Sequence, residues 1–317
     1  MADYCRTKEA HHLGQVTLYA DVAAAYVQFR LMQRLAEIAR ENVTVQQQTV
    51  AFAKRRLKAG QVGRLDVVEA IAQMQATAAI VPQFQEQAQL AVHQLQVLTG
   101  QAPNRSLQQA LGKAAIPSPQ ATLGVGVPAD LVRRRPDIRQ AEQDLISANH
   151  QVGAAVADFY PQLSLLGTIS VDSRNVSSLF QWNSTVFQVG PQVRWGILQF
   201  GRVKSNVDVQ SARFQRLTVT YKRTVLTAIR EVEDGLASYK RQGQRVESLE
   251  KAAMASREAL KLSLQRYNAG LVTIARILDS QNRRLQNEQN LAISQAAIAL
   301  SLIRVYKAVG GGWRSVQ

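Results

Sequence analysis

The four histidines and the single cysteine are the residues best suited to metal binding or nucleophilic chemistry, and their spacing supports neither. His11, His12, His93 and His150 are dispersed along the 317-residue chain without the spacing of a metal site. Cys5 stands alone, which excludes an internal disulfide and a cysteine-based zinc site. No glycine-rich phosphate loop, nucleophile elbow or carboxylate pair stands out. We therefore expect no enzyme, no catalytic residue, no cofactor and no metal.

The charge balance is the next feature with chemical meaning. The chain has 38 Lys+Arg against 23 Asp+Glu, a formal net charge of +15. Such a surface can bind nucleic acid or anionic lipid. However, the basic runs at 54–58, 133–135 and 240–245 are scattered between long helical patterns, and no nucleic-acid-binding module is present. Solvated helix faces, with structural ion pairs near 133–135, explain these runs more simply. A soluble basic helical scaffold or nucleic-acid binder is the alternative that stays open.

The distribution of proline predicts very long helices at both ends of the chain. All eight prolines lie between Pro82 and Pro191, and residues 14–59 and 203–268 contain few turn signals. Helices of this length exceed those of globular domains and indicate a coiled coil or a helical barrel. Pro82 is expected to kink the helix that contains it. No uninterrupted apolar run approaches the roughly 18 residues of a membrane-spanning helix.

The two ends of the chain also repeat each other. Residues 54–70 (KRRLKAGQVGRLDVVEA) align with residues 264–280 (LQRYNAGLVTIARILDS) when Gly60 is placed on Gly270. Each segment follows a long helical pattern and precedes another of about 35 residues, which is the pattern of an αα-hairpin with an Ala-Gly turn. The sequence therefore predicts two copies of one long helical hairpin.

Between the repeats, the apolar residues follow the period of a β-strand. From 163 to 171, and again from 187 to 197, the odd-numbered residues are mostly apolar and the even-numbered ones mostly polar. Two such stretches joined by a polar link have the length and pattern of a membrane β-hairpin, although an amphipathic hairpin on a soluble core shows the same alternation. The residues predicted to face the membrane are Leu163, Leu165, Ile169, Val171, Phe187, Val189, Val193, Trp195 and Ile197.

Five stretches, in this order, resemble one known family. They are residues 127–170 (VPADLVRRRPDIRQAEQDLISANHQVGAAVADFYPQLSLLGTIS), 190–202 (GPQVRWGILQFGR), 224–239 (TVLTAIREVEDGLASY), 267–281 (YNAGLVTIARILDSQ) and 305–313 (VYKAVGGGW). Each motif is loose by itself, but the ordered set resembles the TolC-like outer-membrane efflux ducts, in particular their lipoprotein branch (NodT or OprM-like). The resemblance covers the chain from about Leu18 to Trp313.

This resemblance implies a mainly α-helical fold in which long helical hairpins form a helical barrel and the strands contribute to a trimeric β-barrel. A single β-hairpin has unpaired edges, so its barrel can close only between chains. The family implies a homotrimer in the outer membrane of a Gram-negative bacterium, in contact with its lipid and extending into the periplasm. It also implies a passive exit channel for drugs or other small molecules in a tripartite pump. The partners would be a periplasmic adaptor (membrane fusion) protein and an inner-membrane RND transporter, with no nucleic acid.

The resemblance also assigns roles near the two predicted turns. Asp66 and Tyr267 match residues that close the periplasmic end of the duct, and Asp279 matches an inner acidic position that narrows the pore. Arg276 stands where relatives often have Asp, and we expect it to approach Asp66 and reinforce closure. The alternative is that Asp66 and Arg276 are exposed helix residues of little effect. The adaptor is expected to contact the turns at Ala59, Gly60, Val62, Ala269, Gly270 and Val272.

The beginning of the chain departs from the family pattern. Family members start with a signal peptide, and the lipoprotein branch continues with a lipidated cysteine, a pair of helices and a first barrel hairpin. Cys5 lacks the apolar stretch of a lipidation site, so we expect an ordinary thiol and an N-terminally truncated copy. A remnant of the duct family that does not assemble is a further alternative. The expected organisation is an unmatched N-terminus (1–13), a first periplasmic helical hairpin (14–100), an equatorial linker (101–136), a helix leading to the barrel (137–160), a membrane β-hairpin (161–200), a second periplasmic helical hairpin (201–309) and a C-terminal tail (310–317).

Overall fold

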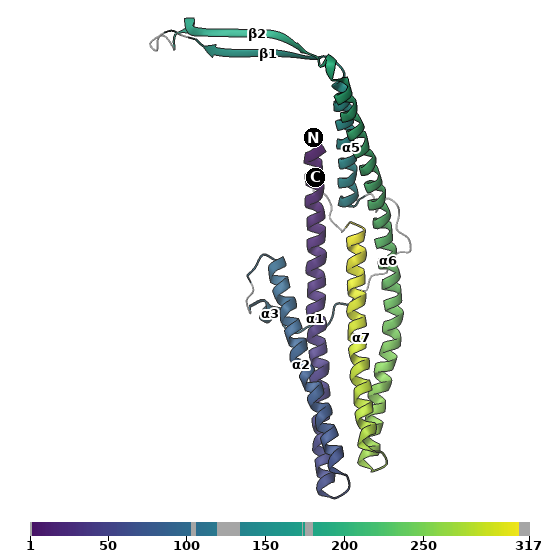
Figure 1. Cartoon of the computed structure of the whole chain (residues 1–317). Helices are drawn as coiled ribbons and strands as arrows, with labels where there is room; N and C mark the ends of the chain where they lie inside the picture. The colour runs from purple at the N-terminus through teal and green to yellow at the C-terminus, as the bar shows by residue number, and fades with distance from the viewer. Residues whose placement is uncertain (1, 103–105, 119–133, 173, 175–179, 311–317) are drawn as a thin grey trace. The chain divides into compact units, whose positions relative to one another are not determined.

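Two very long helices dominate the structure. The computed structural model describes residues 2–102, 106–118, 134–172, 174 and 180–310. Helix α1 (Ala2–Lys58) has 57 residues and helix α6 (Phe200–Asn268) has 69, which confirms the prediction from the proline-free ends of the chain (Figure 1). Both helices contribute to two compact units, one of Met1–Ala10 with Asp137–Val225 and one of His11–Pro136 with Leu226–Gln317.

The second unit contains the predicted pair of helical hairpins. Helix α1 is followed by α2 (Arg64–Leu98), and α6 is followed by α7 (Ile274–Ala308), with both turns at the same end of the unit (Figure 1). Helices α2 and α7 have 35 residues each, as the repeat predicted. Helix α2 continues through Pro82. The expected equatorial linker contains the short helix α3 (Ser106–Leu111), while its residues 103–105 and 119–133 lie outside the described part of the chain.

The two turns have the same backbone geometry. Gly60 and Gly270 adopt φ values of 70° and 75°, a left-handed conformation in which a side chain would be strained. The amide of each glycine donates to the carbonyl three residues earlier, at 3.0 Å and 2.9 Å respectively. The next amide donates to the carbonyl five residues earlier, at 2.9 Å in both turns. This is the Schellman motif, which satisfies the last carbonyls of α1 and α6.

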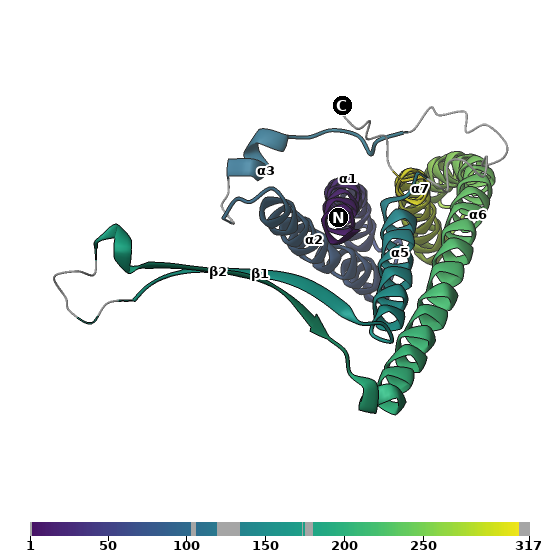
Figure 2. The ribbon, with the colours of Figure 1, turned by 90° about the horizontal axis from the view of Figure 1, so that it is seen from above.

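Small residues on α7 allow α1 to pack closely against it. The two helices lie side by side in the view down the helices in Figure 2, and one apolar cluster joins them. Because burial of apolar surface contributes about 25 cal/mol per Å² removed from water, these contacts stabilise the packing of the two hairpins. The buried members of this cluster are Val27, Leu31, Leu35 and Ile38 on α1, and Leu285, Ala292, Ala296 and Ala299 on α7.

Helix α7 differs from the sequence expectation in one respect. Among the described residues it is the single helix that is long and apolar enough, by length and composition, to cross a membrane. Polar residues such as Ser294 and Gln295 interrupt its apolar sequence, so a search for uninterrupted apolar runs does not find this helix. Several of its apolar residues, including Leu285, Ala292 and Ala296, pack against α1, and a core helix meets the same criterion as a membrane span.

Gly235 and Gly243 provide a matched test of packing between α6 and α7. A Cβ atom at Gly235 would lie 2.8 Å from Cγ2 of Val305, whereas one at Gly243 would meet no atom within 4 Å. Alanine at either position gains about 1 kcal/mol of helix propensity. Because Val305 is β-branched and cannot easily move aside, we expect Gly235→Ala to lower the free energy of unfolding by about 1–2 kcal/mol. Gly243→Ala should raise it; equal effects in urea unfolding would contradict the close packing.

The first unit contains helix α5 (Pro136–Ala157) and a two-stranded antiparallel ribbon of β1 (Gln162–Val171) and β2 (Thr185–Arg194) (Figure 2). The register places Leu163 opposite Val193 and Ile169 opposite Phe187. The odd-numbered residues of both strands therefore share one face, as the alternation predicted. The start of α1 pairs with α5 through Arg6–Asp144 and Glu9–Arg139, both at 3.6 Å.

The second strand ends earlier than the sequence predicted. Strand β2 stops at Arg194, so Trp195 and Ile197 lie beyond the ribbon, and Ile197 begins a short 3-10 helix (Ile197–Gln199). A turn explains this end, because the amide of Gln199 donates to the carbonyl of Gly196 at 3.0 Å. The indole of Trp195 donates to the carbonyl of Phe159 at 3.2 Å instead of extending the alternation.

Candidate functional site

Tyr267 is the central residue of the turn region. Its side chain is 1% exposed, in an apolar cluster that joins the two hairpins, and Phe52 packs edge-on against it with ring centroids 5.5 Å apart. Its hydroxyl has no hydrogen-bond partner among the described residues. Burial raises the pKa of Tyr267 above 10.0; the charge of Arg56 opposes this shift and the charge of Asp66 adds to it. The phenol is therefore neutral at physiological pH, and Asp66 lies close enough to influence it.

Arg56 links the two turns directly. Its Nη1 donates to the carbonyl of Tyr267 at 3.1 Å, and its guanidinium carbon lies 5.0 Å from the centre of the tyrosine ring. Its Nε donates to the side chain of Gln61 at 3.2 Å. The C-terminus of a helix carries partial negative charge, so a guanidinium at the last turn of α6 is favourable. The sequence analysis did not identify Arg56. Its position in the last turn of α1, next to the predicted hairpin turn, could have indicated a role there.

The structure connects the four expected gate residues in two pairs, Asp66 with Tyr267 and Arg276 with Asp279. Asp66 lies in the first turn of α2, and its charge raises the pKa of Tyr267. Asp279 pairs with Arg283 at 3.0 Å and with Arg276 at 3.7 Å. Within one chain, Arg276 thus pairs with Asp279. The expected approach of Arg276 to Asp66 concerns the assembled duct and stays a prediction.

The turn residues expected to contact an adaptor are accessible at their centres. Ala59, Gly60, Ala269 and Gly270 are exposed. Val62 and Val272 are half-buried, and Val272 packs against the apolar cluster around Tyr267. The Ala-Gly pair at the centre of each turn thus presents backbone and one small side chain, against which another protein can pack closely.

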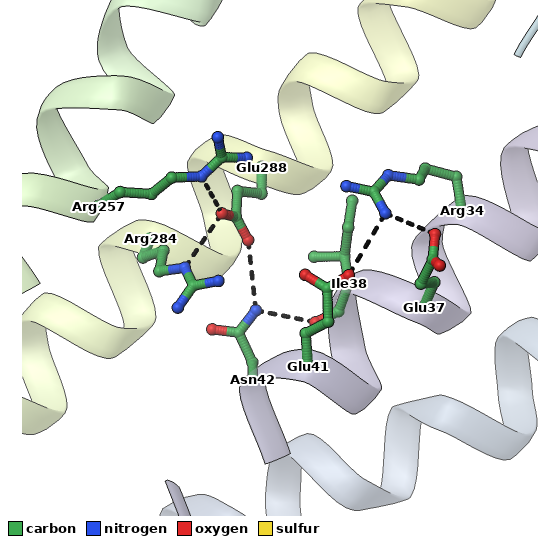
Figure 3. Close-up of polar contacts among 8 residues, drawn as sticks. All are labelled: Arg34, Glu37, Ile38, Glu41, Asn42, Arg257, Arg284 and Glu288. Atoms are coloured by element: carbon green, nitrogen blue, oxygen red, sulfur yellow. Dashed lines mark hydrogen bonds and ion pairs between the residues drawn. The ribbon is translucent and has the colours of Figure 1, made fainter. Parts of the chain in front are cut away.

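A buried ionic cluster joins three helices further from the turns (Figure 3). Glu288 of α7 is 3% exposed, and its Oε1 accepts from Nε of Arg257 at 2.6 Å and from Nε of Arg284 at 3.0 Å. Its Oε2 lies 3.5 Å from the amide of Asn42 on α1, which also donates to the Ile38 carbonyl at 2.8 Å. Burial alone raises the pKa of Glu288, but the two guanidinium groups outweigh it and hold the pKa below 4.5.

Buried amides extend this cluster toward the turns. Gln281 donates to Thr49 at 2.9 Å, and the side chain of Gln46 is buried without a hydrogen-bond partner among the described residues. These polar residues separate the apolar cluster near the turns from the one around Leu285. Sequence reasoning missed them, although their spacing was a signal. Gln281 and Glu288 are seven apart and alternate with Leu285 and Ala292, which places polar residues on the buried seam of α7.

A third structural contact explains part of the basic run at 133–135. Arg135 is buried, donates from Nη1 to the Ala308 carbonyl at 2.8 Å and pairs through Nη2 with Glu231 at 2.8 Å. It therefore ties the segment before α5 to α6 and to the end of α7. This is a structural role, as expected, with partners on distant helices. Arg133 and the residues after Gly310 lie outside the described part of the chain.

Paired long hairpins with matching turns and an apolar-faced strand ribbon define the class of TolC-like envelope channels. The family model described as outer membrane efflux protein matches residues 2–101 and 127–311. The chain belongs to this family, whose members are channel proteins. The match begins at residue 2 and so includes most of the N-terminal segment that the five motifs left unmatched.

Known relatives and solved structures agree with this assignment. The chain is 29% identical over 315 residues to nodulation protein T of Rhizobium leguminosarum bv. trifolii, covering 96% of this chain and 65% of the relative. It is 32% identical over 324 residues to the solvent efflux pump outer membrane protein SrpC of Pseudomonas putida, covering 99% and 66%. The chain thus spans just under two thirds of these relatives. The structure of the outer-membrane channel OprN matches with a TM-score of 0.92 at 31% identity, covering 98% of this chain and 70% of OprN.

Proposed function

We propose that this chain is a protomer of an outer-membrane exit duct, a passive channel for small molecules across the periplasm and outer membrane. The observation that carries the proposal is the duplicated hairpin, with the same glycine turn at the end of each copy. Duplication supplies two similar hairpins per protomer, so a few chains related by symmetry can enclose a helical tube. The comparisons favour this function over a soluble basic scaffold or a nucleic-acid binder.

The ribbon supports a place in the membrane. Its odd-numbered residues form one apolar face, and every residue of β1 is exposed. Only closed barrels and helices satisfy all backbone groups in lipid, so the two edges of this ribbon need further strands beside them, and neighbouring protomers can provide these strands. We therefore place the chain in a homotrimer in the outer membrane of a Gram-negative bacterium. Strand residues facing lipid are Leu163, Leu165, Ile169, Val171, Phe187, Val189 and Val193, with Trp195 and Ile197 just beyond the strand.

The turns are proposed to form the gate and the adaptor site. Tyr267 and Asp66 belong to the gate, together with Arg276 and Asp279, and Arg56 holds Tyr267 in place through its carbonyl and ring. The adaptor contacts the exposed backbone around Gly60 and Gly270, and an RND transporter in the inner membrane provides the driving force. These partners complete a tripartite pump.

Asp66→Ala tests the gate in channels assembled in planar lipid bilayers. Because Asp66 matches a residue that closes the periplasmic end in the family, we expect its loss to give a conductance several-fold higher than that of the unaltered channel. A change of about 1.4 kcal/mol in the gate equilibrium alters the open fraction tenfold. Glu69→Ala, which removes an exposed acid one turn later on α2, is the matched control. Equal conductance of the two variants would remove Asp66 from the gate.

A further inference from the structure

The two hairpin turns share a backbone but differ in surface charge. We call residues 54–65 the first tip and residues 264–275 the second tip, which correspond position by position. The first tip contains five Lys and Arg residues and no carboxylate, whereas the second contains one cation, Arg266. Since the second tip forms the same turn without the other charges, folding of the turn does not require them. The cations without a basic counterpart are Lys54, Arg55, Lys58 and Arg64.

These four cations have no acidic partner in the part of the chain that the structure describes. All four are exposed, and none forms an ion pair with the described residues. Arg55 lies over the ring of Phe52 at 5.6 Å, which orients its guanidinium without neutralising it. Leu65, 68% exposed, adds an apolar residue at the edge of the first tip. Like charges on a rigid turn repel one another, and binding of an anionic group relieves that repulsion.

We propose that the first tip binds an acidic segment of the periplasmic adaptor. The proposal rests on the exit-duct function, which requires an adaptor. Another copy of the first tip is excluded as the occupant because it carries the same charge. Asp279 is already paired with Arg276 and Arg283. Both turns lie at the same end of the unit, so a flat lipid surface would meet both, whereas a protein segment can bind one alone (Figure 1). The charge difference between the tips favours the protein segment.

The test uses the full chain and a defined probe. The probe is a synthetic helical peptide with a glutamate-rich end, and its control has every Glu replaced by Gln; fluorescence anisotropy measures binding. We expect the acidic peptide to bind about tenfold more tightly than its control at low salt, and to lose this advantage as ionic strength rises. The triple variant K54Q/K58Q/R64Q should bind the acidic peptide about tenfold more weakly than the unaltered chain. K240Q/R241Q/R245Q, which removes the same number of exposed charges from the middle of α6, is the matched control.

Each alternative outcome is distinguishable. Equal loss in both triple variants would attribute binding to overall charge and overturn the proposal. Lipid would be the occupant if the unaltered chain bound vesicles containing phosphatidylglycerol, the first-tip variant did not, and neither peptide was preferred. That result would also overturn the proposal. Channel conductance of the unaltered protein, measured separately in bilayers, reports on the exit-duct function. Conductance without peptide preference would reject the first-tip site and leave the duct function standing.

Discussion

Glu288→Ala is expected to lower the free energy of unfolding of the helical hairpins by about 3 kcal/mol. The substitution leaves Arg284, whose side chain is 17% exposed, with a charge that neither water nor a carboxylate neutralises. Arg257 is 51% exposed and can be solvated again, which keeps the loss at the lower end of the range for a broken buried ion pair. Urea unfolding followed by circular dichroism measures the difference.

The surface provides the control for this prediction. Glu37 pairs with Arg34 at 2.5 Å, but both side chains are more than a third exposed (Figure 3). Water screens such pairs, so Glu37→Ala is expected to change the free energy of unfolding by no more than about 0.5 kcal/mol. If the two variants were equally stable, the Glu288 cluster would not hold the hairpins together.

The cluster around Glu288 also predicts that the free energy of unfolding falls at acidic pH. The pKa of Glu288 is lower in the folded protein than its ordinary value of 4.5, so the folded state binds this proton less readily than the unfolded state does. The stabilisation is therefore complete above pH 4.5 and disappears as the pH falls through the lower, folded-state pKa. Glu288→Gln should lack this component of acid destabilisation. An unchanged acid transition in that variant would contradict the assignment.

The repeated turns show how much of the fold the sequence contains. Glycine at the end of a long helical pattern is a local signal, because few other residues adopt the left-handed conformation found at Gly60 and Gly270. The alternation in β1 is equally local, and it predicted both the strand and its apolar face. The end of β2 was not predictable, because it depends on a turn at Gly196 and on a contact between Trp195 and Phe159.

The candidate site was less predictable because its contacts join residues far apart in the chain. Arg56 and Tyr267 meet across two hairpins, and no local pattern pairs a cation with a carbonyl 211 residues away. Glu288 requires partners on α1 and α6 to be stable when buried, and a charged residue in a helical sequence is ordinarily read as exposed. The family resemblance supplied Tyr267 and Asp66, whereas the structure supplied Arg56.

Ile169→Arg is expected to abolish assembly in the outer membrane. Ile169 is 74% exposed on the apolar face of the ribbon, opposite Phe187. A cation on the lipid-facing side of a membrane strand costs about 2–4 kcal/mol near the bilayer midplane, and a trimer incurs this cost in each of its chains. We expect the amount of trimer in the outer-membrane fraction, measured by gel electrophoresis without heating, to fall to background.

Thr168→Arg provides the matched control, because it places the same cation one residue earlier on the opposite face of β1, across from Gln188. A barrel interior is polar, so this variant should assemble at close to the normal level. The two variants differ only in the face that carries the arginine, since both introduce the same side chain into the same strand. Failure of both variants would indicate that the ribbon tolerates no cation, and assembly of both would show that the odd-numbered face does not contact lipid. Failure of Thr168→Arg alone would reverse the two faces, because shifting a strand by one residue exchanges its lipid and interior sides.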